Sequence, residues 1–182
     1  DPVRDSKGFL LHFQIRMKIE SDSSRRETEF RQLQASKGNE FISPGTFVRD
    51  FKLKTLKGKE LTLQSLAGKV IVFNFWFSVC KPCQTEIPEL NELAESFKDS
   101  ADVVFIAVDW EKSDAVAQYT TNNQFKYQVC AEASAFIDAM GIKFYPTHLV
   151  VDRTGVIFSS YTGGIQGISS TLREDILDAL AN

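Results

Sequence analysis

The chain has 182 residues, a net charge of −3 and 43% hydrophobic residues, which suits one domain with some additions. The charge is too small to indicate a surface for nucleic acid or anionic lipid, and three cysteines are too few for a disulfide-rich scaffold. No apolar run approaches the roughly 18 residues that span a bilayer. Because the sequence begins with Asp1 and not with methionine, we expect a trimmed form.

The N-terminal part of the chain differs in pattern from the rest. Residues 9–20 alternate between apolar and polar side chains, which predicts a half-buried strand. Residues 25–42 are polar and weakly patterned, and Pro44-Gly45 then predicts a turn. We therefore divide the chain into an N-terminal β extension, residues 1–44, and a main domain, residues 45–182.

The main domain is predicted to begin with a hairpin and then to alternate strands with helices. Residues 51–55 and 60–63 flank Leu56-Lys57-Gly58, as in a hairpin. The predicted strands that follow are 70–76, 103–108, 127–130, 148–151 and 156–161, the last two joined by a turn. The predicted helices lie between 70–76 and 103–108, at 113–123, at 134–140 and at 170–180. The first of these helices has Ile87, Leu90, Leu93, Ala94 and Phe97 on one face, and the last has Leu172, Ile176, Leu177 and Leu180 on one face. This order predicts an α/β fold with a mixed sheet between two helical layers.

Two of the cysteines form a Cys-x-x-Cys motif, Cys80-Lys81-Pro82-Cys83, between a predicted strand and a predicted helix. The free N–H groups and the dipole of a helix N-terminus favour the thiolate, which is the species that attacks disulfides. Cys80 is the predicted nucleophile, and Cys83, one turn further on and more shielded, is the predicted resolving thiol. Structural zinc takes four ligands. Only Cys130 and His148 could complete that number, and nothing brings them together, so we expect no metal.

The residues around the motif resemble a known family. The stretch Phe75–Cys83 resembles the active-site segment of thioredoxin-like proteins, and Gln84-Thr85-Glu86-Ile87-Pro88 continues the CxPCxxExP pattern of the TlpA/ResA group. Tyr145-Pro146-Thr147 resembles the cis-proline loop of the same proteins. The resemblance covers roughly residues 45–182 and implies a thioredoxin-like three-layer α/β/α sandwich. One departure is Val79, which stands where the group usually has tryptophan.

The resemblance also implies a function. It implies a protein disulfide reductase, periplasmic or membrane-anchored and facing the periplasm, with cytochrome c maturation as an example of a client pathway. Cys80 would attack, Cys83 would resolve, Glu86 would assist proton transfer, and Pro146 would be cis beside the cysteine pair. We expect no cofactor, disulfide-bearing protein clients, a membrane electron donor for recycling, no nucleic acid, and a monomer.

Other residues are assigned by weighing their ordinary roles. From the residues alone, Glu86 is a surface glutamate and Pro146 is trans, and only the resemblance reverses both. Asn74 is expected to be a buried amide with its hydrogen bonds made, and Cys130 a packed core residue. The side chains expected to line the substrate site are Trp76, which also fits the core, and Val79, Lys81, Pro82, Tyr145, Pro146 and Thr147.

Two other functions remain as alternatives. A peroxidase of related fold would carry Thr or Ser three residues before the reactive cysteine, where this chain has Phe77. A copper carrier would pair its cysteines with a histidine, and neither His12 nor His148 is placed near the motif by the sequence.

Overall fold

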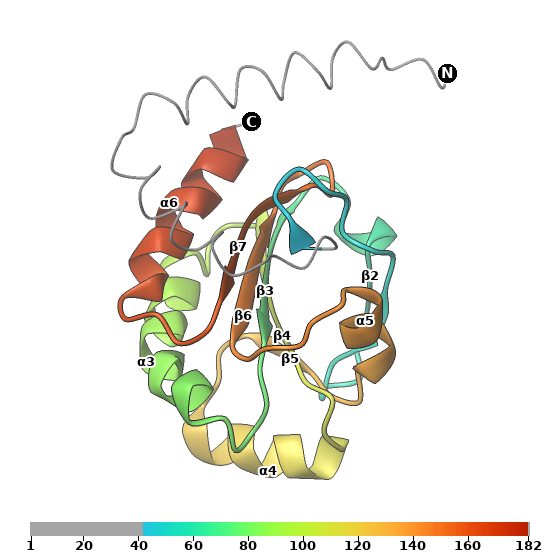
Figure 1. Ribbon diagram of the computed structural model, residues 1–182, viewed down its shortest axis with the longest axis vertical. Coiled ribbons are helices and arrows are strands. Elements are labelled where there is room, and N and C mark those ends of the chain that lie inside the picture. Colours follow the sequence, from blue (N-terminus) through green and yellow to red (C-terminus); the bar gives the residue numbers. More distant parts are fainter. Residues whose placement is uncertain (1–41, 182) are drawn as a thin grey trace. The chain divides into compact units, whose positions relative to one another are not determined.

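A five-stranded mixed sheet forms the centre of the described part of the chain, which is residues 42–181 of a computed structural model (Figure 1). Its order is β5-β4-β3-β6-β7; β3, β4 and β5 run parallel, and β6 and β7 are antiparallel to their neighbours. The bounds of these strands are β3 Val70–Phe75, β4 Val103–Val108, β5 Gln128–Cys130, β6 Thr147–Val151 and β7 Ile157–Thr162. The predicted mixed sheet is confirmed.

Helices cover the sheet on both faces. The helices are α3 Lys81–Ser96, α4 Ser113–Asn123, α5 Ser134–Ala139 and α6 Ile168–Ala181. Helices α3 and α6 lie side by side on one face, whereas α5 and the hairpin of β1 (Lys52–Lys54) and β2 (Glu60–Thr62) lie on the other (Figure 1). This is the three-layer thioredoxin-like arrangement, and the predicted hairpin before β3 is also confirmed.

The central strand β3 explains why the sheet is buried on both sides. Every residue of β3 is buried, and alternate side chains enter different clusters. Phe73 and Phe75 pack with the hairpin and α5, while Val70 and Val72 pack with α3 and α6. A strand covered on both faces is apolar along nearly its whole length, which is the pattern of residues 70–76, where only Asn74 is polar.

The final helix corrects one detail of the predicted pattern. Leu172, Ile176 and Ala179 of α6 are buried, but Leu177 is 52% exposed. At 100° per residue, Leu177 is turned away from the face that Ile176 presents to the sheet, so it does not belong to the buried stripe.

The segment before β3 contacts both outer strands of the sheet. Gly45 N–H donates to the carbonyl of Ile157 at 2.8 Å, and Ile157 is the first residue of the outer strand β7. Further along, Thr55 forms an antiparallel bridge with Cys130 in the other outer strand, β5, and Leu56 N–H donates to the carbonyl of Val129 at 2.9 Å. One stretch of chain therefore reaches from one border of the sheet to the other.

The division of the chain at residue 44 stays a prediction. The described residues belong to one compact unit, Asn39–Asn182, and the strand predicted at 9–20 lies outside them. Among residues 42–181, no helix combines the length and the apolar character that crossing a bilayer requires.

Candidate active site

The sheet topology brings four chain segments to one edge. Strand β3 pairs in parallel with β4, so both leave the sheet at the same end. Strand β6 is antiparallel to β3, and Thr147 at its start faces Phe75 at the end of β3. Strand β7 ends at Thr162, opposite Thr147. The residues after β3, β4 and β7 and those before β6 therefore surround one site, as expected for the carboxyl ends of parallel strands.

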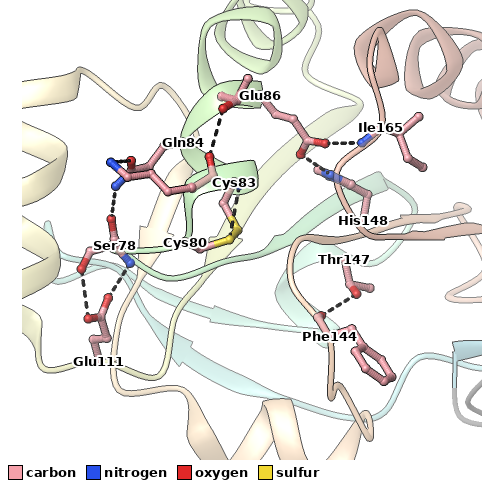
Figure 2. The surroundings of a disulfide bond; sticks show 12 residues. Ser78, Cys80, Cys83, Gln84, Glu86, Glu111, Phe144, Thr147, His148 and Ile165 are labelled. Carbon is pink, nitrogen blue, oxygen red and sulfur yellow. Dashed lines mark hydrogen bonds and ion pairs between the residues drawn. A yellow bond between two sulfur atoms is a disulfide. The ribbon is translucent and has the colours of Figure 1, made fainter.

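Cys80 and Cys83 are joined by a disulfide at the start of α3 (Figure 2). Cys80 is the N-cap residue, and its Sγ accepts the Cys83 N–H at 3.3 Å. The first turn of the helix accommodates Pro82 without losing a hydrogen bond. Cys80 is 5% exposed and Cys83 is 1% exposed, so the predicted order holds, although Cys80 is less open to solvent than expected.

The segment between β3 and Cys80 is held by the carboxylate of Glu111, which lies in the loop after the neighbouring strand β4. Glu111 accepts the N–H of Ser78 at 2.6 Å and its hydroxyl at 3.0 Å. The side-chain amide of Gln84 in α3 donates to the Ser78 carbonyl. These contacts fix the chain immediately before Cys80 (Figure 2).

Glu86 is buried one helical turn after Cys83 and makes two contacts. Its Oε1 accepts the N–H of Ile165 at 2.9 Å, and its Oε2 lies 3.0 Å from Nε2 of His148. Figure 2 shows the carboxylate of Glu86 turned toward both residues. Glu86 is thus not a surface residue, in agreement with the resemblance and not with its ordinary role.

His148 is the residue that the sequence did not assign to the site. Its side chain is fully buried, and it reaches Glu86 across 62 positions of sequence. Alternate residues of a strand share a face, and Val150, two residues after His148 in β6, packs with α3 and α6. The two-residue spacing was therefore the sequence feature that could have placed His148 on the same face as α3.

The peptide bond between Tyr145 and Pro146 is cis, which confirms that expectation. Thr147 is buried, and its hydroxyl donates to the Phe144 carbonyl at 2.9 Å. Tyr145 packs edge-on against Phe77, with ring centroids 5.2 Å apart. The loop is thereby tied to the segment that carries Cys80.

The predicted substrate-site residues differ in exposure. Val79, Lys81 and Pro82 are exposed beside the disulfide. Trp76 is fully buried against Tyr119 and Phe125. The position of Trp76 on the α3 face of the sheet places its side chain in the core, and its contact with substrate stays a prediction.

Two further buried residues were considered from the sequence. Both amide atoms of Asn74 lack a hydrogen-bond partner among the described residues, so the expected satisfied amide is not observed. Cys130 is fully buried, and burial raises the pKa of its thiol to about 12. It is the packed core residue that was expected. Within residues 42–181, no three His, Cys, Asp or Glu side chains are grouped as a metal site would need.

Comparisons with known proteins agree with this geometry. Residues 44–160 match the AhpC/TSA family. The thioredoxin-like protein YneN of Bacillus subtilis is 31% identical over 124 residues, which are 67% of this chain and 73% of YneN. The thiol-disulfide oxidoreductase ResA of Bacillus anthracis is 32% identical over 116 residues, which are 63% of this chain and 66% of ResA.

A solved structure extends the likeness to the fold. The thiol:disulfide interchange protein of Chlorobium tepidum, a thioredoxin family protein, superposes with a TM-score of 0.65 at 26% identity, over 76% of this chain and 97% of that one. With the Cys80–Cys83 pair in place at the start of α3, the chain belongs to the AhpC/TSA family and is a thioredoxin-like thiol–disulfide oxidoreductase of the ResA type.

Proposed function

We propose that this chain reduces disulfide bonds of protein clients, with Cys80 as nucleophile, Cys83 as resolving thiol and Glu86 as proton acceptor. The observation that carries the proposal is the place of Cys80 at the N-cap of α3, where its sulfur accepts the Cys83 N–H at 3.3 Å. A thiolate at this position gains from the same N–H group and from the helix dipole. Cys80 is therefore the sulfur that attacks.

The reaction proceeds in two exchanges. The Cys80 thiolate attacks one sulfur of the client disulfide; a mixed disulfide forms, and the other client sulfur leaves as a thiolate. Cys83 then loses its proton toward Glu86, attacks the Cys80 sulfur, and releases the second client sulfur with the electron pair. The client gains two electrons, and the protein is left with the Cys80–Cys83 disulfide.

The client is proposed to lie over the exposed side chains around the disulfide. Val79 is 72% exposed and Phe144 is 69% exposed, and Trp110 packs against Phe77 while remaining half exposed. Lys81 and Pro82 adjoin this surface, and the loop Tyr145-Pro146-Thr147 borders it. Apolar surface of this kind favours contact with apolar client residues.

The cellular setting is proposed from the resemblance to the TlpA/ResA group. It supports a location in the periplasm, or at a membrane and facing the periplasm, with a membrane electron donor that reduces the Cys80–Cys83 disulfide again. Apocytochromes awaiting maturation are one class of client that fits a reductase in this compartment.

Trapping of the mixed disulfide tests the chemistry. The reduced Cys83→Ser variant should hold a disulfide-bearing client protein in a covalent complex, whereas Cys80→Ser should form none. Cys130→Ser is the matched control, and it should turn over like the unmodified chain. A redox titration of the couple tests the direction, because a strongly reducing potential supports a reductase. Retained turnover in Cys80→Ser would refute the assignment of the nucleophile.

A further inference from the structure

Glu86 of α3, the helix that carries the disulfide, and His148 of β6 form a buried pair between that helix and the sheet. Their side chains are at most 5% exposed, and Oε2 and Nε2 are 3.0 Å apart. The other carboxylate oxygen of Glu86 accepts the Ile165 N–H. Since both oxygens of Glu86 are engaged, the carboxylate cannot turn freely, and its direction depends on His148.

The other ring nitrogen of His148, Nδ1, makes no hydrogen bond to Glu86. Nδ1 is buried and has no hydrogen-bond partner among residues 42–181. No protein group in this part of the chain therefore fixes which of the two ring nitrogens carries the proton, so Nε2, which faces Oε2 of Glu86, can receive a proton from that carboxylate. The Glu86–His148 pair can therefore exist with or without one additional proton.

The groups that face His148 come from each element packed against it. Asn74 on β3 and Tyr161 on β7 are its register partners, so their side chains share its face of the sheet. The Tyr161 hydroxyl donates to Asp175 of α6 at 2.6 Å. From α3 comes the carboxylate of Glu86. Burial raises the pKa of Tyr127, and the charge of Glu86 raises it further, so Tyr127 stays neutral.

We propose that His148 is a positioning residue for the exchange reaction: it aims the Glu86 carboxylate and accepts, through it, the proton that Cys83 gives up. This inference rests on the proposed function. The Cys83 thiol loses its proton to the Glu86–His148 pair, the Cys83 sulfur bonds to Cys80, and the bond between Cys80 and the client breaks with its electron pair on the client sulfur. That thiolate takes a proton from solvent, and the pair later returns its own proton to solvent.

Reaction with 5,5′-dithiobis(2-nitrobenzoic acid) separates the steps. The reduced chain releases one nitrothiobenzoate when Cys80 attacks and a second when Cys83 resolves the mixed disulfide. The variant His148→Gln keeps an N–H donor near the Nε2 position but cannot take up a proton. We expect its first release to match that of the unmodified chain and its second to slow by at least about tenfold, with a changed pH profile.

The outcomes distinguish this inference from the proposed function. If His148→Gln slows both releases by the same factor at every pH, or slows neither, the role of His148 as a proton store is refuted while the exchange reaction stands. If the unmodified chain gives no first release, the proposed function itself is refuted, and this inference with it.

A measurement on the unmodified sequence guards against a variant that fails to fold. The chain has two histidines, His12 and His148, and a His12→Gln variant assigns their signals after labelling of the imidazole nitrogens with ¹⁵N. We expect the ¹⁵N chemical shifts of the His148 ring to differ between the oxidised and reduced forms at the same pH, and identical shifts in both forms would overturn the proposal.

Discussion

Glu111 and Ser78, 33 positions apart, are joined by two hydrogen bonds that fix the approach to Cys80. One carboxylate oxygen accepts the backbone N–H of Ser78, and the other accepts its hydroxyl. The pairing follows from topology, because the parallel strands β3 and β4 end side by side. Glu111 thus holds the backbone that leads to Cys80 through its contacts with Ser78.

Replacing Glu111 should destabilise the chain more than replacing Ser78. Glu111→Ala leaves the Ser78 N–H without its partner, and we expect a loss of about 1–3 kcal/mol in the free energy of unfolding. Ser78→Ala removes only the hydroxyl contact and should cost about 1 kcal/mol. Urea denaturation measures both. Equal losses in the two variants would contradict the role assigned to the backbone hydrogen bond.

Gly164 controls how closely the loop after β7 approaches the first turn of α3. A Cβ added to Gly164 would lie 2.9 Å from Cβ of Pro82, whose ring cannot rotate away. Gly164→Ala should push the loop outward, weaken the contact of Ile165 with Glu86, and cost about 1–3 kcal/mol. The control is Gln166→Ala, at an exposed position of the same loop.

The same pair of variants has a kinetic outcome. Gly164→Ala should slow the second nitrothiobenzoate release, whereas Gln166→Ala should leave it unchanged. An unaltered second release in Gly164→Ala, at reduced stability, would show that the loop contributes packing and not proton transfer.

Cys130 should be inert in the folded protein. Its thiol is fully buried, and burial raises its pKa to about 12, so little thiolate exists near neutral pH. After reduction, alkylation of the native chain should modify Cys80 and leave Cys130 unmodified, whereas alkylation in denaturant should modify all three cysteines. Mass spectrometry counts the adducts, and rapid native labelling of Cys130 would indicate a third redox thiol.

Asp109 should make stability depend on pH. Burial raises its pKa from 3.8 to about 7, so the folded state keeps a proton that the unfolded state has already lost. Its contribution is therefore fully present below about pH 4 and is lost as the pH rises through about 7. In Asp109→Asn the decline in stability between about pH 4 and about pH 7 should be smaller. Urea denaturation across this range tests it, and parallel curves for both proteins would contradict it.

Local patterns were sufficient to predict most of the fold. The alternation of buried strands with amphipathic helices, the hairpin before β3 and the place of Cys80 between β3 and α3 all follow from short-range periodicity. Leu177 shows the limit of this reasoning, since helical spacing alone does not say how wide the buried face is.

The contacts of the site required information from distant residues. Glu86 meets His148 and Ile165 only after β6 has paired with β3 and β7 with β6, and no local pattern encodes that meeting. The cis bond before Pro146 likewise came from the family resemblance, because most bonds before proline are trans. Asn74 was predicted to be buried, but the lack of partners for its amide depends on what α3 and β6 place around it.

The stretch from Gly45 to Leu56 makes backbone hydrogen bonds with both outer strands of the sheet. Outer strands with free backbone groups are the places where sheets of different molecules join and aggregate. By pairing with Ile157 at one border and with Val129 and Cys130 at the other, this stretch occupies part of both borders within the same molecule. Proteolytic removal of this stretch would expose the backbone of both outer strands, β5 and β7. We therefore expect the cleaved protein to aggregate before it loses its redox chemistry.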